Sequence, residues 1–388
     1  MSLVAIKNKK SSMKNFLFLL FFFTPVQLFA QTTIQGNFTH NGINRTYRLY
    51  IPAAYNPGFA VPLVLNLHGY SSNALEQELY SNFKPIADTA NFLIVHPDGT
   101  DDGTGNQFWN SVGAPNVDDV DFLSALIDTI SSNYTVDQNC IYSTGMSNGG
   151  FMSHKLACDL GSKITAIASV TGTMTWNEYN NCTPQHPTPV MQVHGTADPI
   201  VPYYGSMSVV AVDSVVNFWV LKNNCDSIPI YTSVTDINQN DGCTAEHYLY
   251  PNGNNGASVE LYKIIDGGHT WPGSLFVIGV TNQDFSASAE IWKFFRKYKL
   301  NVLTSQQGNY QGTLNGEKIY PNPSSGDLTI EFKNVGYRQI YVSDLLGRID
   351  KYFYCSGGDF NFFLDKQGVY FITITEGGCS FTHKVVIF

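Results

Sequence analysis

The residues best suited to chemistry lie around Ser147, in the run Gly-Met-Ser-Asn-Gly at 145–149. A β-rich run at 140–144 precedes this turn, and a segment with helical apolar spacing at 151–160 follows it. A serine flanked by glycines between a strand and a helix is typical of a nucleophile elbow, a tight turn that exposes the hydroxyl and strains the backbone. The pattern therefore predicts a nucleophilic serine; an inert serine in a glycine-rich turn is the alternative.

A serine hydroxyl is a poor nucleophile unless a base takes its proton, so the chain must also supply a histidine and a group that orients it. The apolar run 189–194 is followed by a loop that carries Asp198, and the run 259–265 by a loop that carries His269. Both loops are rich in glycine and proline and follow predicted strands, where ligands bind in open parallel sheets. We predict that Asp198 and His269 complete a triad with the serine, with Asp266 as a rival acid.

An acyl-transfer site also needs backbone N–H donors for the oxyanion. The first amide of the helix after the elbow belongs to Asn148, and helix N-termini favour negative charge. The second donor is expected after the apolar strand at 62–68, where Gly69 and Tyr70 follow. We predict the amides of Tyr70 and Asn148 as the oxyanion hole, and a plain turn at Gly69 is the alternative.

The elements around these residues alternate between strands and helices. Alternating stretches at 32–40 and 45–52 predict an antiparallel hairpin at a sheet edge. Continuous apolar runs predict buried strands, and apolar residues at helical spacing predict helices. In chain order these are a strand at 62–68, helix 74–83, strand 92–95, helix 118–132, strand 140–144, the helix after the elbow, and strands 164–170, 189–194 and 259–265. The alternation predicts an α/β fold with a mostly parallel sheet covered by helices on both faces.

Length and charge bound the kind of protein. With 388 residues the chain exceeds one ordinary domain, so two parts are expected. Lysines before an apolar run, and a small residue at Ala30, predict a secretory signal peptide over 1–30. The apolar run is too short for a membrane span, so none is expected in the mature chain. The formal net charge of −9, without clusters of Lys and Arg, argues against a nucleic acid partner.

Export places the seven cysteines in an oxidising compartment, where disulfides form. Their spacing permits three pairs, although sequence alone does not fix the connectivity. The pairs are Cys158 with Cys182, Cys225 with Cys243, and Cys355 with Cys379. Cys140 is left over, and a buried thiol on a strand is its simplest interpretation. No spacing of Cys and His resembles a zinc site, so no metal is expected.

The C-terminal part differs in composition from the rest. Residues 301–317 are rich in Gln, Asn, Gly, Ser and Thr, which is typical of a flexible linker. From 318 to 388, short alternating runs bounded by turn residues predict a small all-β sandwich. The catalytic part is accordingly expected over 31–300.

Several motifs of the catalytic part, in the right order, resemble the secreted polyhydroxybutyrate depolymerase and feruloyl esterase group of α/β-hydrolases. The resemblance covers about residues 35–298. It rests on Leu-His-Gly-Tyr at 67–70, the elbow at 145–150, Leu-Ala-Cys at 156–158, His-Gly-Thr-Ala-Asp at 194–198, Val-Pro-Tyr at 201–203, Gly-Gly-His-Thr-Trp-Pro-Gly at 267–273 and the helical run 287–295. It implies an α/β-hydrolase fold and ester hydrolysis by the predicted triad, a mechanism that needs no cofactor.

The same resemblance implies two disulfides, Cys158–Cys182 and Cys225–Cys243. It also makes Trp271 a wall of the acyl pocket. Trp109 and Tyr203 are further aromatic candidates for that pocket, although core positions are equally compatible with them. Tyr70 departs from the small or Cys-containing loop that is commoner in this family, which leaves the pocket shape open.

The tail resembles the C-terminal sorting domain of the type IX secretion system. The motifs are Tyr-Pro-Asn-Pro-Ser-Ser-Gly at 320–326, Leu-Leu-Gly-Arg at 345–348, Gly-Val-Tyr at 368–370 and Lys-Val-Val-Ile at 384–387. The resemblance implies that export machinery is a partner, and that the protein passes the periplasm and outer membrane to become secreted or bound to the cell surface. A polymer- or carbohydrate-binding module is the alternative.

Together these features predict an exported serine ester hydrolase that works through an acyl-enzyme. The expected substrates, which include polymers, are feruloyl or acetyl esters of polysaccharides, or polyhydroxybutyrate-type polyesters. A catalytically silent surface binding protein on a hydrolase scaffold, and a peptidase, are the alternatives.

Overall fold

The chain divides into two compact units, residues 1–300 and 301–388. The computed structural model describes residues 31–111, 117–300, 318–332, 338–344, 348–355, 358–376 and 379–388. The predicted signal peptide, 1–30, and linker, 301–317, lie outside the described residues.

Ten strands of the first unit form one mixed sheet, in the order β1-β2-β4-β3-β7-β8-β9-β12-β11-β10. Its centre, from β4 to β12, is parallel, and both edges are antiparallel. In chain order the strands are β1 (Thr32–His40), β2 (Ile43–Ile51), β3 (Val61–Leu67), β4 (Leu93–Pro97), β7 (Val136–Met146), β8 (Ala166–Val170), β9 (Val190–Gly195), β10 (Ile230–Ser233), β11 (Thr244–Tyr250) and β12 (Val259–Ile265). A separate two-stranded hairpin consists of β5 (Thr100–Asp101) and β6 (Gln107–Phe108).

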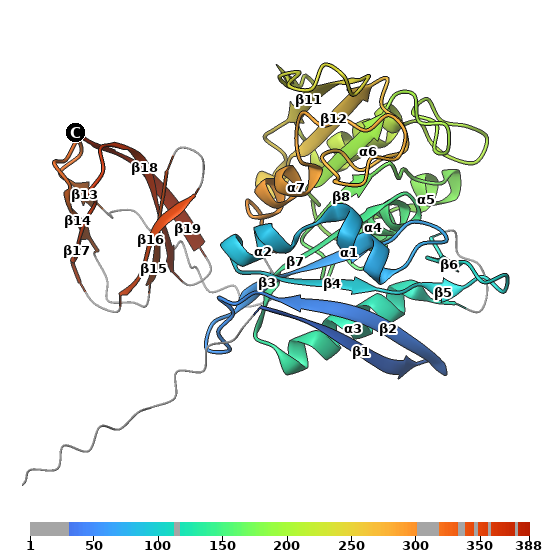
Figure 1. The fold of residues 1–388 in the computed structure, drawn as a ribbon, viewed down its shortest axis with the longest axis horizontal. Coiled ribbons are helices and arrows are strands. Elements are labelled where there is room, and N and C mark those ends of the chain that lie inside the picture. Colours follow the sequence, from blue (N-terminus) through green and yellow to red (C-terminus); the bar gives the residue numbers. More distant parts are fainter. Residues whose placement is uncertain are drawn as a thin grey trace, which may run out of the picture. The chain divides into compact units, whose positions relative to one another are not determined.

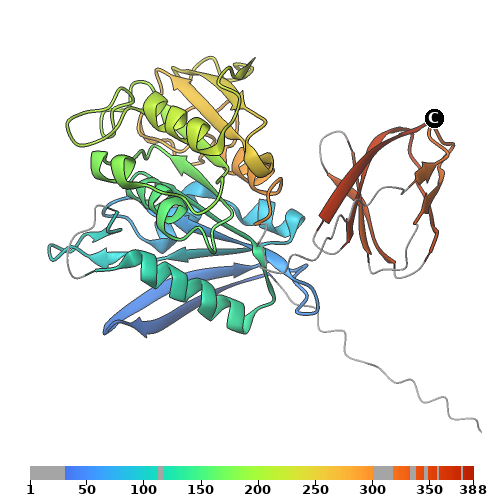
Figure 2. The ribbon, with the colours of Figure 1, turned by 180° about the vertical axis from the view of Figure 1, so that it is seen from behind.

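Helices cover both faces of this sheet, as the sequence predicts. In chain order they are α1 (Ala74–Ser81), α2 (Lys84–Ala90), α3 (Asp119–Asn133), α4 (Asn148–Asp159), α5 (Trp176–Asn181), α6 (Val212–Asn223) and α7 (Ala287–Phe295), with a 3₁₀ turn, η1, at Asn254–Gly256. Helices α1, α2 and α7 pack on one face, and α3, α4 and α6 on the other. Figure 1 shows α1 and α2 in front of the sheet, and Figure 2, seen from behind, brings α3 and α4 forward.

The apolar character of the central strands follows from this double cover. All five residues of β8 are buried, as are all residues of β9 and six of the seven in β3. A strand with a helix on each face must be apolar in both directions, which explains the continuous apolar runs in the sequence. The predicted edge hairpin is also present, because β1 pairs antiparallel with β2 around a turn in which Asn41 and Gly42 both have positive φ.

The second unit is all β, as predicted. A three-stranded sheet, β13-β14-β17, and a four-stranded sheet, β16-β15-β18-β19, share one cluster of buried apolar side chains. The strands are β13 (Lys318–Tyr320), β14 (Asp327–Glu331), β15 (Arg338–Asp344), β16 (Ile349–Cys355), β17 (Phe360–Phe363), β18 (Gly368–Glu376) and β19 (Cys379–Ile387). Two sheets closed over one core make a small sandwich.

Candidate active site

The turn between β7 and α4 has the geometry of a nucleophile elbow. Ser147 has φ 53° and ψ −118°, a conformation that is costly for a residue with a side chain. The flanking glycines are required by space: a Cβ on Gly145 would lie 2.6 Å from the Gly149 carbonyl carbon, and one on Gly149 would lie 2.3 Å from the Leu67 oxygen. The amide of Ser147 also donates to the carbonyl of Val170 at 2.8 Å, which fixes the turn against β8.

Asp198 and His269 meet although 71 residues separate them. Asp198 follows β9, His269 follows β12, and these strands are neighbours in the parallel part of the sheet. Their side chains form a 2.7 Å contact between Asp198 Oδ2 and His269 Nδ1. The rival acid, Asp266, is exposed, and its amide donates to the hydroxyl of Thr196.

The carboxylate of Asp198 is buried and well supplied with donors. Its Oδ1 accepts the amides of Ile200 and Val201 at 2.8 and 2.9 Å, and its Oδ2 also lies 3.3 Å from His194 Nε2. Burial by itself would raise the pKa of Asp198, but the contacts from His194, His269 and the Val201 amide outweigh it and hold the pKa well below its usual value. Asp198 is therefore an anion over the whole range in which most proteins are folded.

Ser147 and His269 line the same cavity, which has a volume of about 490 Å³. The cavity lies at the carboxyl ends of β3 and β7, where ligands bind in open α/β sheets. Its lining residues are Gly69, Tyr70, Ser72, Glu76, Gln77, Leu79, Tyr80, Met146, Ser147, His269, Phe276 and Ile278. The wall is thus a mixture of apolar side chains and a few polar ones, which suits an organic ester.

The loop with the second predicted oxyanion donor lies beside the serine. A Cβ on Gly69 would be 3.6 Å from Ser147 Cβ, so the backbone at 69–70 approaches the nucleophile closely. His68 accepts the amide of Gly99 on Nε2 at 2.9 Å, so its Nδ1 carries the proton that it donates to the Gly69 carbonyl at 2.7 Å. Because the N–H of a trans peptide points opposite to its carbonyl, this bond fixes the direction of the Tyr70 amide.

The segment around the β5–β6 hairpin ties the two predicted oxyanion donors together. Trp109 donates its indole N–H to the carbonyl of His68 at 3.0 Å. Its backbone amide donates to the side-chain oxygen of Asn148 at 2.6 Å, and its carbonyl accepts the Asn148 side-chain NH₂ at 3.0 Å. On the other side, Ser71 donates its amide to the carbonyl of Gln107 at 2.8 Å. Trp109 therefore holds together the two segments that carry the predicted oxyanion donors.

The structure places the three aromatic residues that were candidates for the acyl pocket in the core, outside the lining of this cavity. Trp109, Trp271 and Tyr203 are each 1% exposed and none is among the lining residues. Trp271 donates its indole N–H to Ser288 and packs against Phe83, so it belongs to the core under α7. Aromatic and apolar walls come instead from Tyr70, Tyr80, Phe276 and Ile278, of which only Tyr70 was singled out in the sequence.

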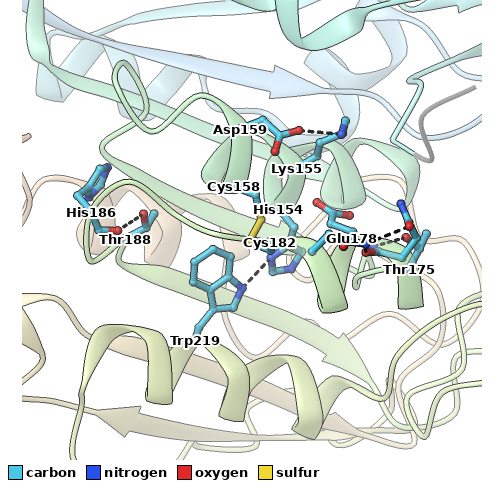
Figure 3. Close-up of a disulfide and its surroundings, with 12 residues drawn as sticks. His154, Lys155, Cys158, Asp159, Thr175, Glu178, Cys182, His186, Thr188 and Trp219 are labelled. Carbon is cyan, nitrogen blue, oxygen red and sulfur yellow. Dashed lines mark hydrogen bonds and ion pairs between the residues drawn. A yellow bond between two sulfur atoms is a disulfide. The ribbon is translucent and has the colours of Figure 1, made fainter. Parts of the chain in front are cut away.

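One predicted disulfide is present and one is not. Cys158 at the end of α4 bonds to Cys182 after α5, with Cα atoms 5.2 Å apart (Figure 3). Cys225 and Cys243 form no disulfide. They lie at opposite ends of β11: Asp226 bonds to Pro251 after the strand, and Cys243 directly precedes Thr244 at its start. Seven residues of strand span roughly 23 Å, and a disulfide needs Cα atoms within about 7 Å.

The remaining cysteines are not catalytic candidates. Cys140 is buried on β7, and burial raises the pKa of its thiol to about 12, so it is a neutral core group at physiological pH. The predicted Cys355–Cys379 pair cannot be followed, because the Cys379 side chain lies outside the described residues. Within the described part of the chain, no group of three or more His, Cys, Asp or Glu side chains is arranged to hold a metal ion. No helix among the described residues is long and apolar enough to cross a membrane.

Two family models match parts of this chain. Residues 117–228, which include the elbow and Asp198, match the phospholipase/carboxylesterase family. Residues 318–388 match the secretion system C-terminal sorting domain. The second unit is thus a sorting domain for type IX secretion, and the chain is exported.

Three curated proteins are similar to this chain over more than half of its length. The protein NocK of Nocardia uniformis subsp. tsuyamanensis is 27% identical over 69% of this chain and 84% of NocK. The bifunctional acetylxylan esterase/xylanase XynS20E of Neocallimastix patriciarum is 26% identical over 76% of this chain and 39% of that protein. Feruloyl esterase B of Piromyces equi is 31% identical over 56% of this chain and 41% of its own length. The chain therefore spans about two fifths of these last two relatives.

Proposed function

We propose that this chain, a carboxylic ester hydrolase with an α/β-hydrolase fold and a secretion sorting domain, forms an acyl-enzyme on Ser147. The observation that carries the proposal is one cavity lined by both Ser147 and His269, with His269 bonded from behind to a buried carboxylate at 2.7 Å. Asp198 accepts the Nδ1 proton, so Nε2 of His269 is unprotonated and free to act as the base.

In the acylation step, Ser147 Oγ attacks the ester carbonyl while His269 takes its proton. The resulting imidazolium is stabilised by Asp198 and then protonates the leaving alcohol. The amides of Tyr70 and Asn148 receive the oxyanion: the first has a direction set by His68, and the second is the first amide of α4. A water activated by His269 then attacks the acyl-enzyme and releases the acid.

The substrates we propose are feruloyl or acetyl esters of plant polysaccharides. Support comes from the relatives, whose names give acetylxylan esterase and feruloyl esterase activities. Export through the sorting domain agrees with a substrate too large to enter the cell. The cavity of about 490 Å³ has room for an aromatic acyl group, and Tyr70, Tyr80 and Phe276 in its wall offer rings for such a group to pack on.

A water-insoluble polyester of the polyhydroxybutyrate type is a second candidate, which one observation favours. The loop at the cavity rim carries four consecutive exposed apolar residues, Leu275 to Ile278. An exposed apolar run beside a catalytic cavity suits contact with an apolar surface. In this case the enzyme would adsorb on the polymer before hydrolysis.

The decisive experiment compares the purified chain with Ser147→Ala on methyl ferulate, acetylated xylan and amorphous polyhydroxybutyrate. We expect hydrolysis of one of the first two, and a loss of kcat of about 10⁶-fold in the alanine variant. A folded Ser147→Ala protein that retains esterase activity would contradict the mechanism. Failure of a fluorophosphonate to label the wild type at Ser147 would favour a silent binding protein, and comparable rates on peptide amides would favour a peptidase.

A further inference from the structure

Behind the proposed triad, four buried polar side chains form a row that ends at Asp198. Trp219 Nε1 lies 3.2 Å from His154 Nδ1 (Figure 3), and His154 Nε2 lies 3.1 Å from Gln192 Oε1. Gln192 Nε2 lies 3.2 Å from His194 Nδ1, and His194 Nε2 lies 3.3 Å from Asp198 Oδ2. None of the four is more than 1% exposed. The row runs from α6 through α4 and β9 to the proposed catalytic acid.

Chemistry alone fixes the direction of every hydrogen bond in this row. An indole N–H can only donate, so His154 Nδ1 accepts from Trp219 and His154 Nε2 carries the proton. The Gln192 amide is oriented by its 2.7 Å bond to the Gly172 carbonyl, which only an NH₂ can make. Gln192 therefore accepts from His154 and donates to His194 Nδ1, which leaves the His194 proton on Nε2. All the N–H groups point toward Asp198.

The last histidine holds Asp198 in two ways. Its Nε2–H donates to the carbonyl of Val201 at 2.8 Å, while the amide of the same Val201 donates to Asp198 Oδ1 at 2.9 Å. His194 thus anchors the turn that carries the acid. The same Nε2–H group, which carries a partial positive charge, lies 3.3 Å from Asp198 Oδ2. This is the carboxylate oxygen that contacts His269.

We propose that His194, backed by Gln192, His154 and Trp219, is a positioning residue that keeps Asp198 ionised and aimed at His269. The inference rests on the proposed function of the triad. Hydrogen bonds aligned in one direction polarise each other. The four groups together therefore stabilise the Asp198 anion more than a single imidazole would. In a site closed to water, this row replaces the solvent that would otherwise stabilise the anion.

Apart from His269, no titratable side chain among the described residues other than His194 faces Asp198. The titratable groups facing Asp198 are His269 from the loop after β12 and His194 from β9. Around His194 lie the ring of Tyr203, at 6.0 Å between centroids, and Lys263, its register partner on β12. Lys263 Nζ lies over the Tyr203 ring and the Tyr203 hydroxyl bonds to Asp213, so both have other partners. His154, in turn, is kept neutral because burial lowers its pKa to about 4.

The test compares His194→Leu and His194→Gln with His96→Leu in the full chain. His96 is a matched control: it is also a fully buried histidine on a central strand, bonded to an amide side chain, Asn66, but it does not touch the triad. We expect His194→Leu to lower kcat about tenfold with little change in KM, because the bond that anchors the Val201 turn and the N–H group beside the Asp198 carboxylate are both lost. Glutamine, which can still donate, should restore most of the rate.

The pH profile separates positioning from plain stability. Without the N–H groups at its back, Asp198 becomes more basic, so the Asp198–His269 pair holds its proton more tightly. The acid limb of the kcat/KM profile should therefore move up by about one pH unit in His194→Leu. The proton resonance between His269 and Asp198 should shift as well, whereas both readouts should be unchanged in His96→Leu.

A second variant covers the case in which His194→Leu does not fold. Trp219→Phe keeps an aromatic ring in the core but removes the donor that sets the direction of the row. We expect kcat to fall two- to threefold, with a limb shift of a few tenths of a pH unit. Equal pH profiles in wild type, both row variants and the His96 control would overturn the inference. Absence of Ser147 labelling in the wild type would instead overturn the proposed function.

Discussion

The two sides of the catalytic cavity are built in opposite ways. On the acid–base side, the Asp198 side chain is fully buried and its two oxygens contact two amides and two histidines. On the substrate side, Tyr70, Phe276 and Ile278 are 53%, 52% and 64% exposed. The hydroxyl of Tyr70 is tethered to Asp102, which is itself on the surface.

The fold thus fixes the positions of the proton-transfer groups closely and constrains the exposed wall of the cavity much less. The proton-transfer groups take their geometry from the core, so a change there should affect every substrate equally. The exposed wall takes its geometry from a few surface contacts, so a change there should affect some substrates and spare others. The first and last of the three predictions below test this division, and the second tests a buried acid outside the cavity; they are given in order of decreasing effect.

The largest effect should come from Asp198→Asn. Asparagine fills the same space but cannot accept the Nδ1 proton from His269 as a carboxylate does, so the wrong tautomer of the histidine is favoured. We expect kcat to fall about 10⁴-fold with KM nearly unchanged, for methyl ferulate and for a small acetyl ester alike. Steady-state kinetics on both substrates measure this.

Asp266→Asn is the matched control. Asp266 is exposed, three residues before His269, and its left-handed backbone, φ 61°, is one that asparagine tolerates well. Rates within twofold of the wild type are expected. If this variant, and not Asp198→Asn, lost activity, the acid–base side would have been assigned to the wrong loop.

The order of elements and the proposed triad could be read from the sequence, because glycine spacing and apolar runs report local needs. Each proposed catalytic residue follows a strand, and a parallel sheet gathers the ends of its strands at one edge. The edge strands β10 and β11 and helix α6 were not predicted, since their patterns are short or apolar all round. The Cys225–Cys243 pair that the resemblance implies is wrong, because β11 separates the two cysteines.

Burial was the second obstacle. A tryptophan that packs in the core and one that lines a pocket look alike in sequence, so the sequence leaves both positions open for Trp109, and only the resemblance makes Trp271 a pocket wall; both are buried. The sequence does, however, contain an indication of the row of buried polar side chains behind Asp198. Gln192 and His194 interrupt a strand predicted to be buried on both faces, and polar groups in such places need partners. The cavity wall at Phe276 and Ile278 lies on a loop without such a pattern.

A second buried carboxylate sharpens the contrast with Asp198. Glu178 on α5 lies near the disulfide (Figure 3), and neither of its carboxylate oxygens has a hydrogen-bond partner among the described residues. Burial, reinforced by the nearby Asp159 and opposed by Lys155, raises its pKa to about 8. Burial raises the pKa of both carboxyl groups, but only Asp198 has hydrogen-bond donors that outweigh it, so Asp198 is held as the anion and Glu178 as the neutral acid.

This pKa predicts a loss of stability as the pH rises. The folded protein holds the Glu178 proton more tightly than the unfolded chain, so the stabilisation is complete below about pH 4.5 and is lost as the pH rises through about 8. In Glu178→Gln, which cannot ionise, the free energy of unfolding should fall less between pH 5 and 9, by about 4 kcal/mol. Urea unfolding at both pH values measures it, and Glu246→Gln, at a partly exposed acid on β11, is the control. Parallel curves for wild type and Glu178→Gln would show that Glu178 is ionised in the fold.

The smallest effect should come from the exposed wall, through Tyr70→Phe. This change removes the 2.6 Å bond to Asp102 but keeps the ring in the cavity wall and the amide proposed for the oxyanion hole. The released ring must be ordered again whenever a bulky acyl group packs on it, and fixing one such side chain costs about 0.5–1 kcal/mol. We expect KM for methyl ferulate to rise two- to fivefold, with kcat and the kinetics of a small acetyl ester unchanged.

Asp102→Asn should behave in the same way, whereas Tyr204→Phe, at an exposed tyrosine outside the cavity lining, should change nothing. A fall in kcat on both substrates would mean that the tether also holds the oxyanion loop, and the two sides of the cavity would then not be independent.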